Sequence, residues 1–295
     1  MPRYVYRHRK PTRRRIRVSR ILIFLLLIGM IGYPFLEAAM LQVDHHTVQV
    51  AGLHSSLNHL KIVFASDIHK GSFFSQDRIN SLIATINSQG PDVVILGGDY
   101  AEDSDGAIQF FKTAPPIQAR LGVFGVMGNH DRTGPESNFT VLVAEMTNYG
   151  CLPLTNSVAR VKVGQTYLYI AGVDDYYNGI PDVTGVASQV SRDDFVIFAG
   201  HSPDLLLKAR AAKSKENDNH WFDLALFGHT HGGQVILPGQ PFFRNLVPEL
   251  GARYLSGWRE ENRASILVSN GVGTSFFPVR LFAPPQIHLI TLKVQ

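Results

Sequence analysis

The sequence predicts an α/β fold in which strands and helices alternate along one domain. Short apolar, partly β-branched runs alternate with amphipathic helical segments, and the first three runs are spaced by one βαβ unit of about 30 residues. Polar residues follow many of these runs, as is typical of the carboxyl ends of strands in open α/β sheets. The 295 residues are 45% hydrophobic, enough for a sizeable core, and no Pro/Ser-rich linker divides the body.

A membrane anchor or signal-anchor is predicted at residues 21–43. Residues 21–36 carry no charge and are mainly Leu, Ile and Phe, and the apolar character resumes after Glu37. A bilayer-spanning helix needs about 20 residues, so this continuation supplies the missing length. A cleaved signal peptide would end in small residues spaced like Ala-x-Ala. Leu36 and Glu37 stand two positions before Ala38 and Ala39, which favours an uncleaved anchor. A buried core helix behind a basic tail is the remaining alternative.

The basic charge is concentrated in residues 1–20. They hold nine of the 28 Lys and Arg and no acid, which leaves 19 basic against 24 acidic residues beyond them. The positive-inside rule predicts a cytoplasmic tail, a single pass through the inner (cytoplasmic) membrane, and a domain at 44–295 on the extracytoplasmic side. An acidic body offers no footprint for nucleic acid, so no specific nucleic-acid partner is expected. Cys151 is the sole cysteine, which excludes an intrachain disulfide and leaves the compartment open.

The first strand–helix–strand unit is expected between residues 61 and 97. An apolar strand at 61–66 precedes a helix at 76–88, where four apolar residues fall at i, i+3, i+4 and i+7. Gly90-Pro91 ends that helix, and a second buried strand follows at 92–97.

The same order then repeats. A strand at 122–127 leads into Asn129-His130-Asp131 and a helix at 136–149. Later strands are expected at 166–171, 195–199, 222–227, 264–269 and 287–293.

The residues that follow these strands predict a metal site. They are Asp67, His69, Asp99, Asn129, His130, His201, His229 and His231. Carboxylate and amide oxygens mixed with imidazoles suit Mn, Fe or Zn. Even without His130, the seven remaining potential ligands exceed what one ion can use while it keeps a position for substrate. We therefore expect two divalent ions, with manganese preferred and Asp99 as the bridging carboxylate.

Five ordered motifs resemble those of the calcineurin-like metallophosphoesterase superfamily. They are Asp67-x-His69, Gly98-Asp99, Gly128-Asn129-His130-Asp131, Gly200-His201 and Gly228-His229-Thr230-His231. The Gly-Gly-Gln-Val after His231, residues 269–275 and Pro278-Val-Arg280 are similar to the membrane-anchored bacterial branch. Asn270, where many relatives have Arg, and Gln286, where an acid is frequent, depart from the pattern. Neither is a ligand position, so these differences concern substrate contacts.

The resemblance implies two packed mixed β-sheets flanked by helices, with an N-terminal transmembrane helix. It assigns Asp67, His69 and His231 to the first metal, and Asn129, His201 and His229 to the second. Asp99 bridges the two. His130 is left free to protonate the leaving group, and Asp131 is a candidate to orient it. The implied reaction is phosphoester hydrolysis by a metal-bridging hydroxide.

The substrate is predicted only by class. A domain tethered at the bilayer favours a lipid-linked or envelope phosphodiester or pyrophosphate. Some relatives cleave UDP-2,3-diacylglucosamine in lipid A synthesis, and that cytoplasmic substrate would require the domain on the cytoplasmic face. Two further hypotheses for the chain are a nuclease and a non-catalytic metal-binding scaffold. The oligomeric state is not predicted.

Several residues outside the motifs are expected to have ordinary roles. Four histidines are expected at the surface without a metal: His45, His46, His220 and His288. Lys70 is expected to be solvated, although its place beside His69 would also let it touch a phosphate. Three aromatic residues could form an apolar lip for a lipid chain or pack in the usual way: Phe242, Phe243 and Trp258.

Overall fold

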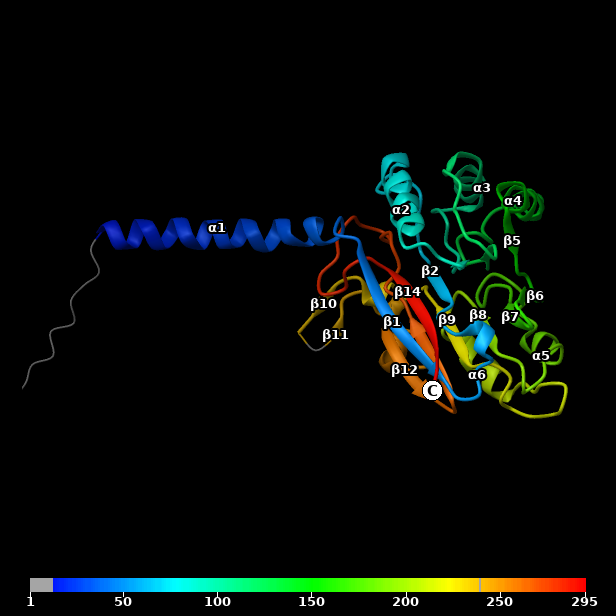
Figure 1. Cartoon of the computed structure of the whole chain (residues 1–295). Coiled ribbons are helices and arrows are strands. Elements are labelled where there is room, and N and C mark those ends of the chain that lie inside the picture. Colours follow the sequence, from blue (N-terminus) through cyan, green and yellow to red (C-terminus); the bar gives the residue numbers. More distant parts are fainter. Residues whose placement is uncertain (1–12, 239) are drawn as a thin grey trace, which may run out of the picture.

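The computed structural model describes residues 13–238 and 240–295, and it contains two six-stranded mixed β-sheets packed face to face between layers of helices (Figure 1). The predicted αββα arrangement is confirmed. Residues 1–12 of the predicted basic tail lie outside the described residues.

The first sheet has the strand order β1-β14-β2-β3-β4-β5. The bounds are β1 Gln42–Val50, β14 Gln286–Val294, β2 Lys61–Ala65, β3 Val93–Leu96, β4 Val123–Gly125 and β5 Cys151–Pro153. Strands β2 to β5 are parallel, whereas β14 is antiparallel to β2 and parallel to β1.

The second sheet has the order β12-β13-β9-β8-β7-β6. The bounds are β12 Gly257–Glu261, β13 Ala264–Val268, β9 Leu224–Phe227, β8 Val196–Ala199, β7 Thr166–Gly172 and β6 Ser157–Val163. Its four inner strands are parallel, and each edge strand is antiparallel to its neighbour. A separate hairpin joins β10 Ile236–Leu237 to β11 Gln240–Pro241.

Six α-helices accompany the sheets in the described part of the chain. They are α1 Arg13–Glu37, α2 Gln76–Ser88, α3 Ser104–Thr113, α4 Glu136–Tyr149, α5 Val183–Ala187 and α6 Leu205–Ala211. Helices α2, α3 and α4 contribute to the core on one face of the first sheet, and α5 and α6 to the core on the outer face of the second. The helices predicted at 76–88 and 136–149 are present at those residues.

The alternation of side chains along each strand produces the layers. In β2, Ile62 and Phe64 enter the core between the sheets, whereas Val63 and Ala65 enter the core under the helices. All four are fully buried. Strands covered on both faces read as continuous apolar runs, which is why these strands were visible in the sequence.

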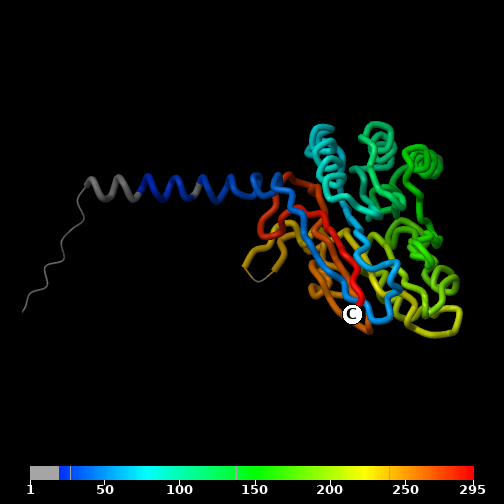
Figure 2. The backbone as a smooth tube through the Cα atoms, in the orientation of Figure 1, coloured from blue at the N-terminus to red at the C-terminus, as the bar shows by residue number. Residues whose placement is uncertain are grey.

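Helix α1 projects away from the body in the backbone trace (Figure 2), and Arg20–Glu37 is long and apolar enough to span a membrane. Ile21, Phe24 and Leu26 are each more than half exposed, so this segment does not form the core helix considered as an alternative. Strand β1 begins at Gln42, and the boundary expected after residue 43 therefore lies inside this strand.

One histidine that was expected at the surface is buried beside strand β1. His288 was expected at the surface, but it is fully buried because β14 runs between β1 and β2. Its Nδ1 lies 3.2 Å from Asp44 Oδ2, and its Nε2 lies 3.0 Å from Ser269 Oγ. His46 is half-buried and stacks on Trp258 with ring centroids 3.9 Å apart, so Trp258 packs within the domain.

Candidate metal centre

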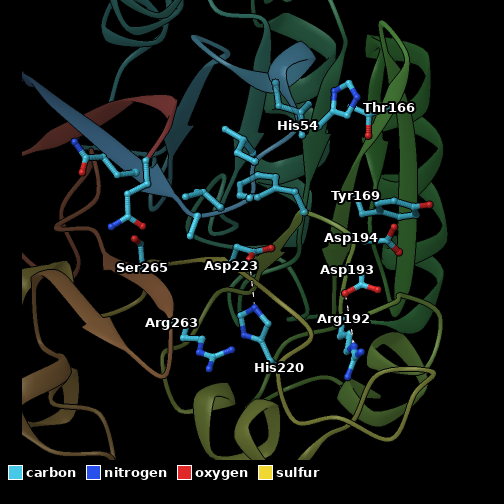
Figure 3. Close-up of a pocket in the computed structure, with 18 of the residues that line it drawn as sticks. His54, Thr166, Tyr169, Arg192, Asp193, Asp194, His220, Asp223, Arg263 and Ser265 are labelled. Atoms are coloured by element: carbon cyan, nitrogen blue, oxygen red, sulfur yellow. Dashed lines mark ion pairs between the residues drawn. The ribbon is translucent and has the colours of Figure 1, made fainter.

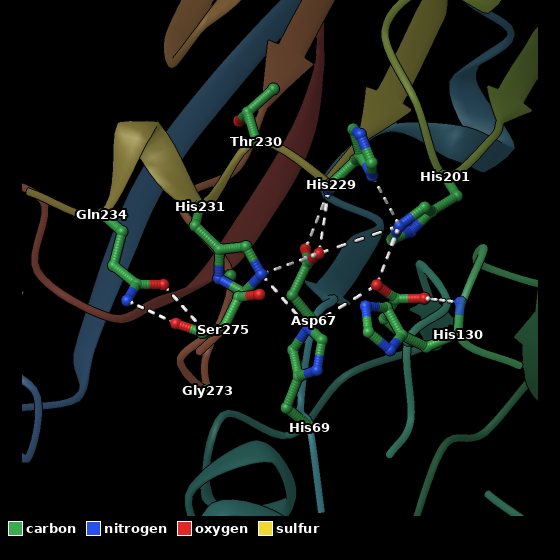
Figure 4. A network of polar contacts seen from close by, with 12 residues as sticks. Asp67, His69, His130, His201, His229, Thr230, His231, Gln234, Gly273 and Ser275 are labelled. Carbon is green, nitrogen blue, oxygen red and sulfur yellow. Dashed lines mark hydrogen bonds and ion pairs between the residues drawn. The ribbon is translucent and has the colours of Figure 1, made fainter. Parts of the chain in front are cut away.

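The predicted ligands lie in the loops after five strands, where the two sheets meet (Figure 4). The loop after β2 provides Asp67 and His69, and the loops after β3 and β4 provide Asp99 and Asn129. In the second sheet, the loop after β8 provides His201, and the loop after β9 provides His229 and His231. Loops from both sheets thus converge on one volume.

Five of these residues have a left-handed backbone. The φ angles are 54° for Asp67, 49° for His69, 53° for Asp99, 69° for His229 and 50° for His231. Residues other than glycine seldom adopt this region, and where they do the surrounding structure must hold them. Such a concentration in one cluster is typical of a functional site.

The first group of donor atoms comprises those predicted for the first metal. Asp67, His69 and His231 each offer one ligand atom, and these atoms lie within 4.8 Å of one another. The Nε2 atoms of His69 and His231 are 3.1 Å apart, and His231 Nε2 lies 3.7 Å from Asp67 Oδ1. All three residues are buried.

The second group lies directly beside the first. His201 Nε2 is 3.2 Å from Asp99 Oδ2, and His229 Nδ1 is 3.3 Å from His201 Nε2 and 2.9 Å from Asn129 Oδ1. The same Asp99 oxygen is also 3.5 Å from His69 Nε2. Asp99 therefore faces both groups, which is the position a bridging carboxylate requires.

Hydrogen bonds behind the ligands fix their orientation. His201 Nδ1 donates to the carbonyl of Gly97 at 2.8 Å, which leaves Nε2 directed at the cluster. The amide of His229 donates to Asp67 at 2.9 Å, and the amide of His130 donates to Asp99 at 2.9 Å. Each carboxylate is thereby held by a neighbouring ligand loop.

Burial and the Asp99 carboxylate together determine the pKa values in the cluster. It lowers the pKa of His69 to about 4 and of His229 to about 3, so both imidazoles are neutral and able to bind a cation. Burial also raises the pKa of Asp67 to about 6. Burial would likewise lower the pKa of His201, but the Asp99 carboxylate raises it well above its usual range.

These donors fit two divalent cations. Asp67 and Asp99 are buried carboxylates, and within the described residues their ion pairs are all with histidines, none with Lys or Arg. Buried charge of this kind is normally compensated by a partner or a metal. Mixed oxygen and imidazole donors match borderline divalent ions, and the identity of the metal is not determined by this set.

His130 lies beside the cluster with its ring partly exposed. Its Nδ1 donates to the carbonyl of Glu102 at 2.8 Å, and its ring centroid is 4.9 Å from that of His69. Asp131, which was expected to orient this ring, instead accepts hydrogen bonds from the amides of Asp99, Tyr100 and Gly128. The carbonyl of Glu102 therefore orients His130, and Asp131 holds the ligand loops.

Two motif glycines are required by close approach. A Cβ at Gly128 would collide with the side chain of Asp99, and a Cβ at Gly228 would collide with that of Asp67. Both glycines precede a ligand in the sequence. The glycines thus allow the carboxylates to pack against neighbouring strand ends.

The loop after β7 contains site residues that the sequence reasoning missed. Tyr177 stacks on His229 with ring centroids 4.9 Å apart, and its hydroxyl donates to Asp204 at 2.7 Å. Asn178 donates to the carbonyl of Asn129 at 2.8 Å, and Asp175 accepts from the amides of Tyr177 and Asn178. Asp175 follows a strand as the predicted ligands do, so the same pattern could have identified it.

Arg280 was also missed, and it is fully buried behind His231. Its guanidinium donates to the carbonyls of Asn270, Gly273 and Ala283 at 2.8 to 3.0 Å, and to that of His231 at 3.3 Å. Arg280 appeared in the sequence only as part of a motif, because its partners are distributed over 53 positions, from 231 to 283. It joins the loop at 270–283 to His231, in the loop after β9.

A wide polar groove lies elsewhere on the domain (Figure 3). Its lining includes Thr166, Phe195 and Asp223, which stand at the beginnings of β7, β8 and β9. His201 and His229 stand past the ends of β8 and β9. The groove therefore lies at the amino-terminal ends of these strands, opposite the metal centre. None of the predicted ligands lines it.

Lys70 and Asn270 can also be placed. The Lys70 amino group donates to Thr113 Oγ1 at 2.7 Å, at the end of α3. Asn270 is buried, and its side chain contacts Ser256 and the carbonyl of Pro284. Both side chains have partners within the protein.

Comparisons with known proteins agree with this geometry. A family model described as calcineurin-like phosphoesterase matches residues 60–233. The uncharacterized metallophosphoesterase YkuE of Bacillus subtilis is 31% identical over 272 residues, which cover 90% of this chain and 90% of that protein. The phosphodiesterase YaeI of Escherichia coli is 31% identical over 238 residues, which cover 79% and 82%.

A membrane protein is among the relatives. The transmembrane protein with metallophosphoesterase domain of Bos taurus is 28% identical over 263 residues, which cover 83% of this chain and 56% of that protein. Together with the apolar helix at Arg20–Glu37, this similarity supports membrane anchoring.

Proposed function

Because this chain belongs to the calcineurin-like phosphoesterase family and is a metal-dependent phosphoesterase, we propose that it hydrolyses a membrane-associated phosphodiester or pyrophosphate, the phosphoester being carried by a lipid or another envelope component. The observation that supports the reaction is the convergence of seven donor residues, among which Asp99 faces both groups. The observation that supports the substrate class is the helix at Arg20–Glu37.

Each ligand has a proposed role. Asp67, His69 and His231 would hold one divalent ion, and Asn129, His201 and His229 the other, with Asp99 shared. When bound, such ions offset charge on a phosphoryl group and lower the pKa of water toward about 7. Manganese is the ion we expect, with iron or zinc as alternatives of the same donor preference.

His130 is proposed as the proton donor to the leaving-group oxygen. Because its Nδ1 is occupied by the Glu102 carbonyl, Nε2 is the nitrogen free to meet a substrate atom. The ring lies beside His69 and is partly exposed, so it is next to the cluster and accessible from solvent. Asp131 supports this arrangement indirectly, through the backbone that carries Asp99.

The test of the reaction uses the full chain in detergent, loaded with manganese and given an aryl phosphodiester. The wild-type protein should turn the substrate over, and chelation should stop turnover until manganese is restored. Asp99→Asn should lose nearly all turnover, because the amide cannot supply a shared negative charge. Lys162→Gln, on β6 away from the cluster, is the matched control. Wild-type rates in Asp99→Asn would refute the shared role.

The side of the membrane decides among substrates. We propose the extracytoplasmic side of the inner membrane, since the arginine-rich tail should stay in the cytoplasm. A fusion of alkaline phosphatase to the C-terminus should be active in cells. A cytoplasmic domain would contradict this orientation and would favour UDP-2,3-diacylglucosamine as substrate.

A further inference from the structure

The end of helix α1 is fastened to the domain that carries the metal centre. The carbonyl of Pro34 accepts from the amide of Arg280 at 2.9 Å, and Glu37 Oε1 accepts from the amide of Ala283 at 2.9 Å. The carbonyl of Ala38 accepts from Arg78 at 2.8 Å, and Glu37 is only 3% exposed. The helix therefore leaves the domain from a fixed point.

Large apolar side chains are exposed on the segments beside this point. They are Leu237 at 41%, Phe242 at 62%, Phe276 at 61%, Phe277 at 60% and Phe282 at 73% exposed, and we refer to them as the aromatic face. In Figure 1 the β10–β11 hairpin and the loop that precedes β14 lie on the side of the body from which α1 projects. The exposed apolar surface is thus next to the predicted membrane helix.

The two segments of the aromatic face are bound to each other. The amide of Ile236 donates to the carbonyl of Leu281 at 2.9 Å, and the amide of Leu281 donates to that of Gln234 at 2.9 Å. The ring of Phe243 stacks on that of Phe276 with centroids 6.0 Å apart. The hairpin and the loop therefore form one surface.

The aromatic face is also joined to the metal centre (Figure 4). Gln234, three residues after His231, donates from Nε2 to the carbonyls of Ser275 and Phe277 at 2.7 and 3.1 Å. The amide of Ser275 donates back to Gln234 Oε1 at 2.8 Å. The buried Gln234 thus links the segment that carries His231 to the loop that carries the exposed Phe276 and Phe277.

We propose that the aromatic face inserts into the same bilayer that α1 spans and holds the metal centre at the membrane surface. A cluster of exposed phenylalanines on a water-facing surface normally marks an interaction site. The bilayer is the apolar phase nearest to this cluster, because α1 enters it from residues that contact the same loop. Amphipathic surfaces of this kind bind by burying apolar side chains at the boundary of headgroups and acyl chains.

Insertion of the aromatic face also specifies the substrate more closely, and this consequence rests on the proposed function. With the aromatic face in the interface, the domain is held against the bilayer and does not swing freely on its helix. A phosphoester headgroup of a lipid would then meet the metal centre without leaving the membrane. The substrate class that follows is a phosphodiester or pyrophosphate carried by a bilayer-resident lipid.

Spin labels on the full chain test the location directly. Cys151 is fully buried, so a nitroxide reagent should react with a cysteine introduced at Phe276→Cys or Phe282→Cys and leave the wild-type protein unlabelled. Leu207→Cys is the matched control, because Leu207 is 53% exposed on α6, which covers the outer face of the second sheet. Each protein is reconstituted in phosphatidylcholine vesicles, and collisions with oxygen and with a water-soluble nickel chelate are compared.

Labels at 276 and 282 should show a several-fold higher ratio of oxygen to nickel collisions than the label at 207. Equal ratios at the three positions would overturn the proposal. So would dipolar broadening at 276 that disappears on dilution with unlabelled protein, because a second copy of the chain would then cover the aromatic face.

Hydrolysis separates this proposal from the proposed function. Phe276→Ser combined with Phe282→Ser should lower turnover of a phosphodiester lipid in vesicles by about tenfold or more, from the apolar area withdrawn from the bilayer. A soluble aryl phosphodiester should be hydrolysed as before, and Leu207→Ser should change neither rate. Equal rates of wild type and the double variant on the vesicle substrate would contradict the proposal. Membrane depth at 276 and 282 without any hydrolysis by the wild type would instead contradict the proposed function.

Discussion

Replacement of Arg280 should destabilise the domain and loosen its metal centre together. Arg280 is fully buried, and its guanidinium donates hydrogen bonds of 3.0 Å or less to three backbone carbonyls: those of Asn270, Gly273 and Ala283. A hydrogen bond to a charged group contributes about 1.5 to 3 kcal/mol, and a buried carbonyl left without a donor costs about 1 to 3 kcal/mol.

Three such carbonyls give a loss of roughly 3 to 9 kcal/mol for Arg280→Met. The lower end is the better expectation, because removal of the buried cation also removes its desolvation penalty. A loss of about 4 kcal/mol corresponds to a fall in Tm of about 8 to 16 °C for a domain of this size. Arg280→Lys keeps the charge and loses the fork that reaches several carbonyls at once, so an intermediate fall is expected.

The assay is thermal unfolding in detergent, followed by the fluorescence of Trp221 and Trp258, with bound manganese measured on the same samples. Arg160→Met is a suitable control, since Arg160 lies on β6 and packs on Tyr167 at the surface. Metal content should fall with Arg280→Met because Arg280 holds the carbonyl of His231. A variant with the wild-type Tm and full manganese would refute the proposed role of Arg280.

Two further predictions concern single residues of the site. His130→Ala should keep its manganese and should slow hydrolysis most for substrates with poor leaving groups, by about 10²- to 10⁴-fold, as loss of a general acid does. His130 also lies near His69 and Asp99. Loss of metal from this variant would therefore show that His130 is a ligand instead. Gly128→Ala should lose most bound metal, since its Cβ would displace the Asp99 carboxylate, and equilibrium dialysis against manganese would detect this. Gly29→Ala, in helix α1, where a Cβ meets no atom within 4 Å, is the control, and unchanged manganese affinity in Gly128→Ala would contradict the steric argument.

Local pattern was sufficient for the parts of the protein that repeat at short range. The strands β2 and β3 are apolar on both faces, and the residues after them form the site, so Asp67 and Asp99 could be identified from their positions. Strand β1 was missed because Gln42–Val50 is mostly polar and partly exposed. Its pairing with β14 lies across 244 positions and leaves no local signal.

The environments of residues whose contacts are distant in the sequence could not be predicted for the same reason. His288 is buried among residues distant in the sequence, including Asp44 of β1 and Ser269, and Arg280 finds its acceptors in loops from separate parts of the chain. Asp131 lies beside the ligands as expected, but its hydrogen-bond partners are backbone amides and not the ring of His130. A carboxylate next to His130 in sequence can reach several backbone amides, and only the folded loop determines which of them it holds.

The pairing of β1 with β14 has a consequence for biosynthesis. Strand β14 is made after every other described strand, yet it occupies an inner position of the first sheet, between β1 and β2. On a chain still attached to the ribosome, β2 therefore has an open edge and β1 has no neighbour, while α1 has long since emerged. Unpaired strand edges of this kind can form non-native pairings with other strands or other chains. We expect protease resistance in chains arrested at increasing lengths to appear only after residues 286–294 have left the exit tunnel; resistance at shorter lengths would show that the sheet closes without its final strand.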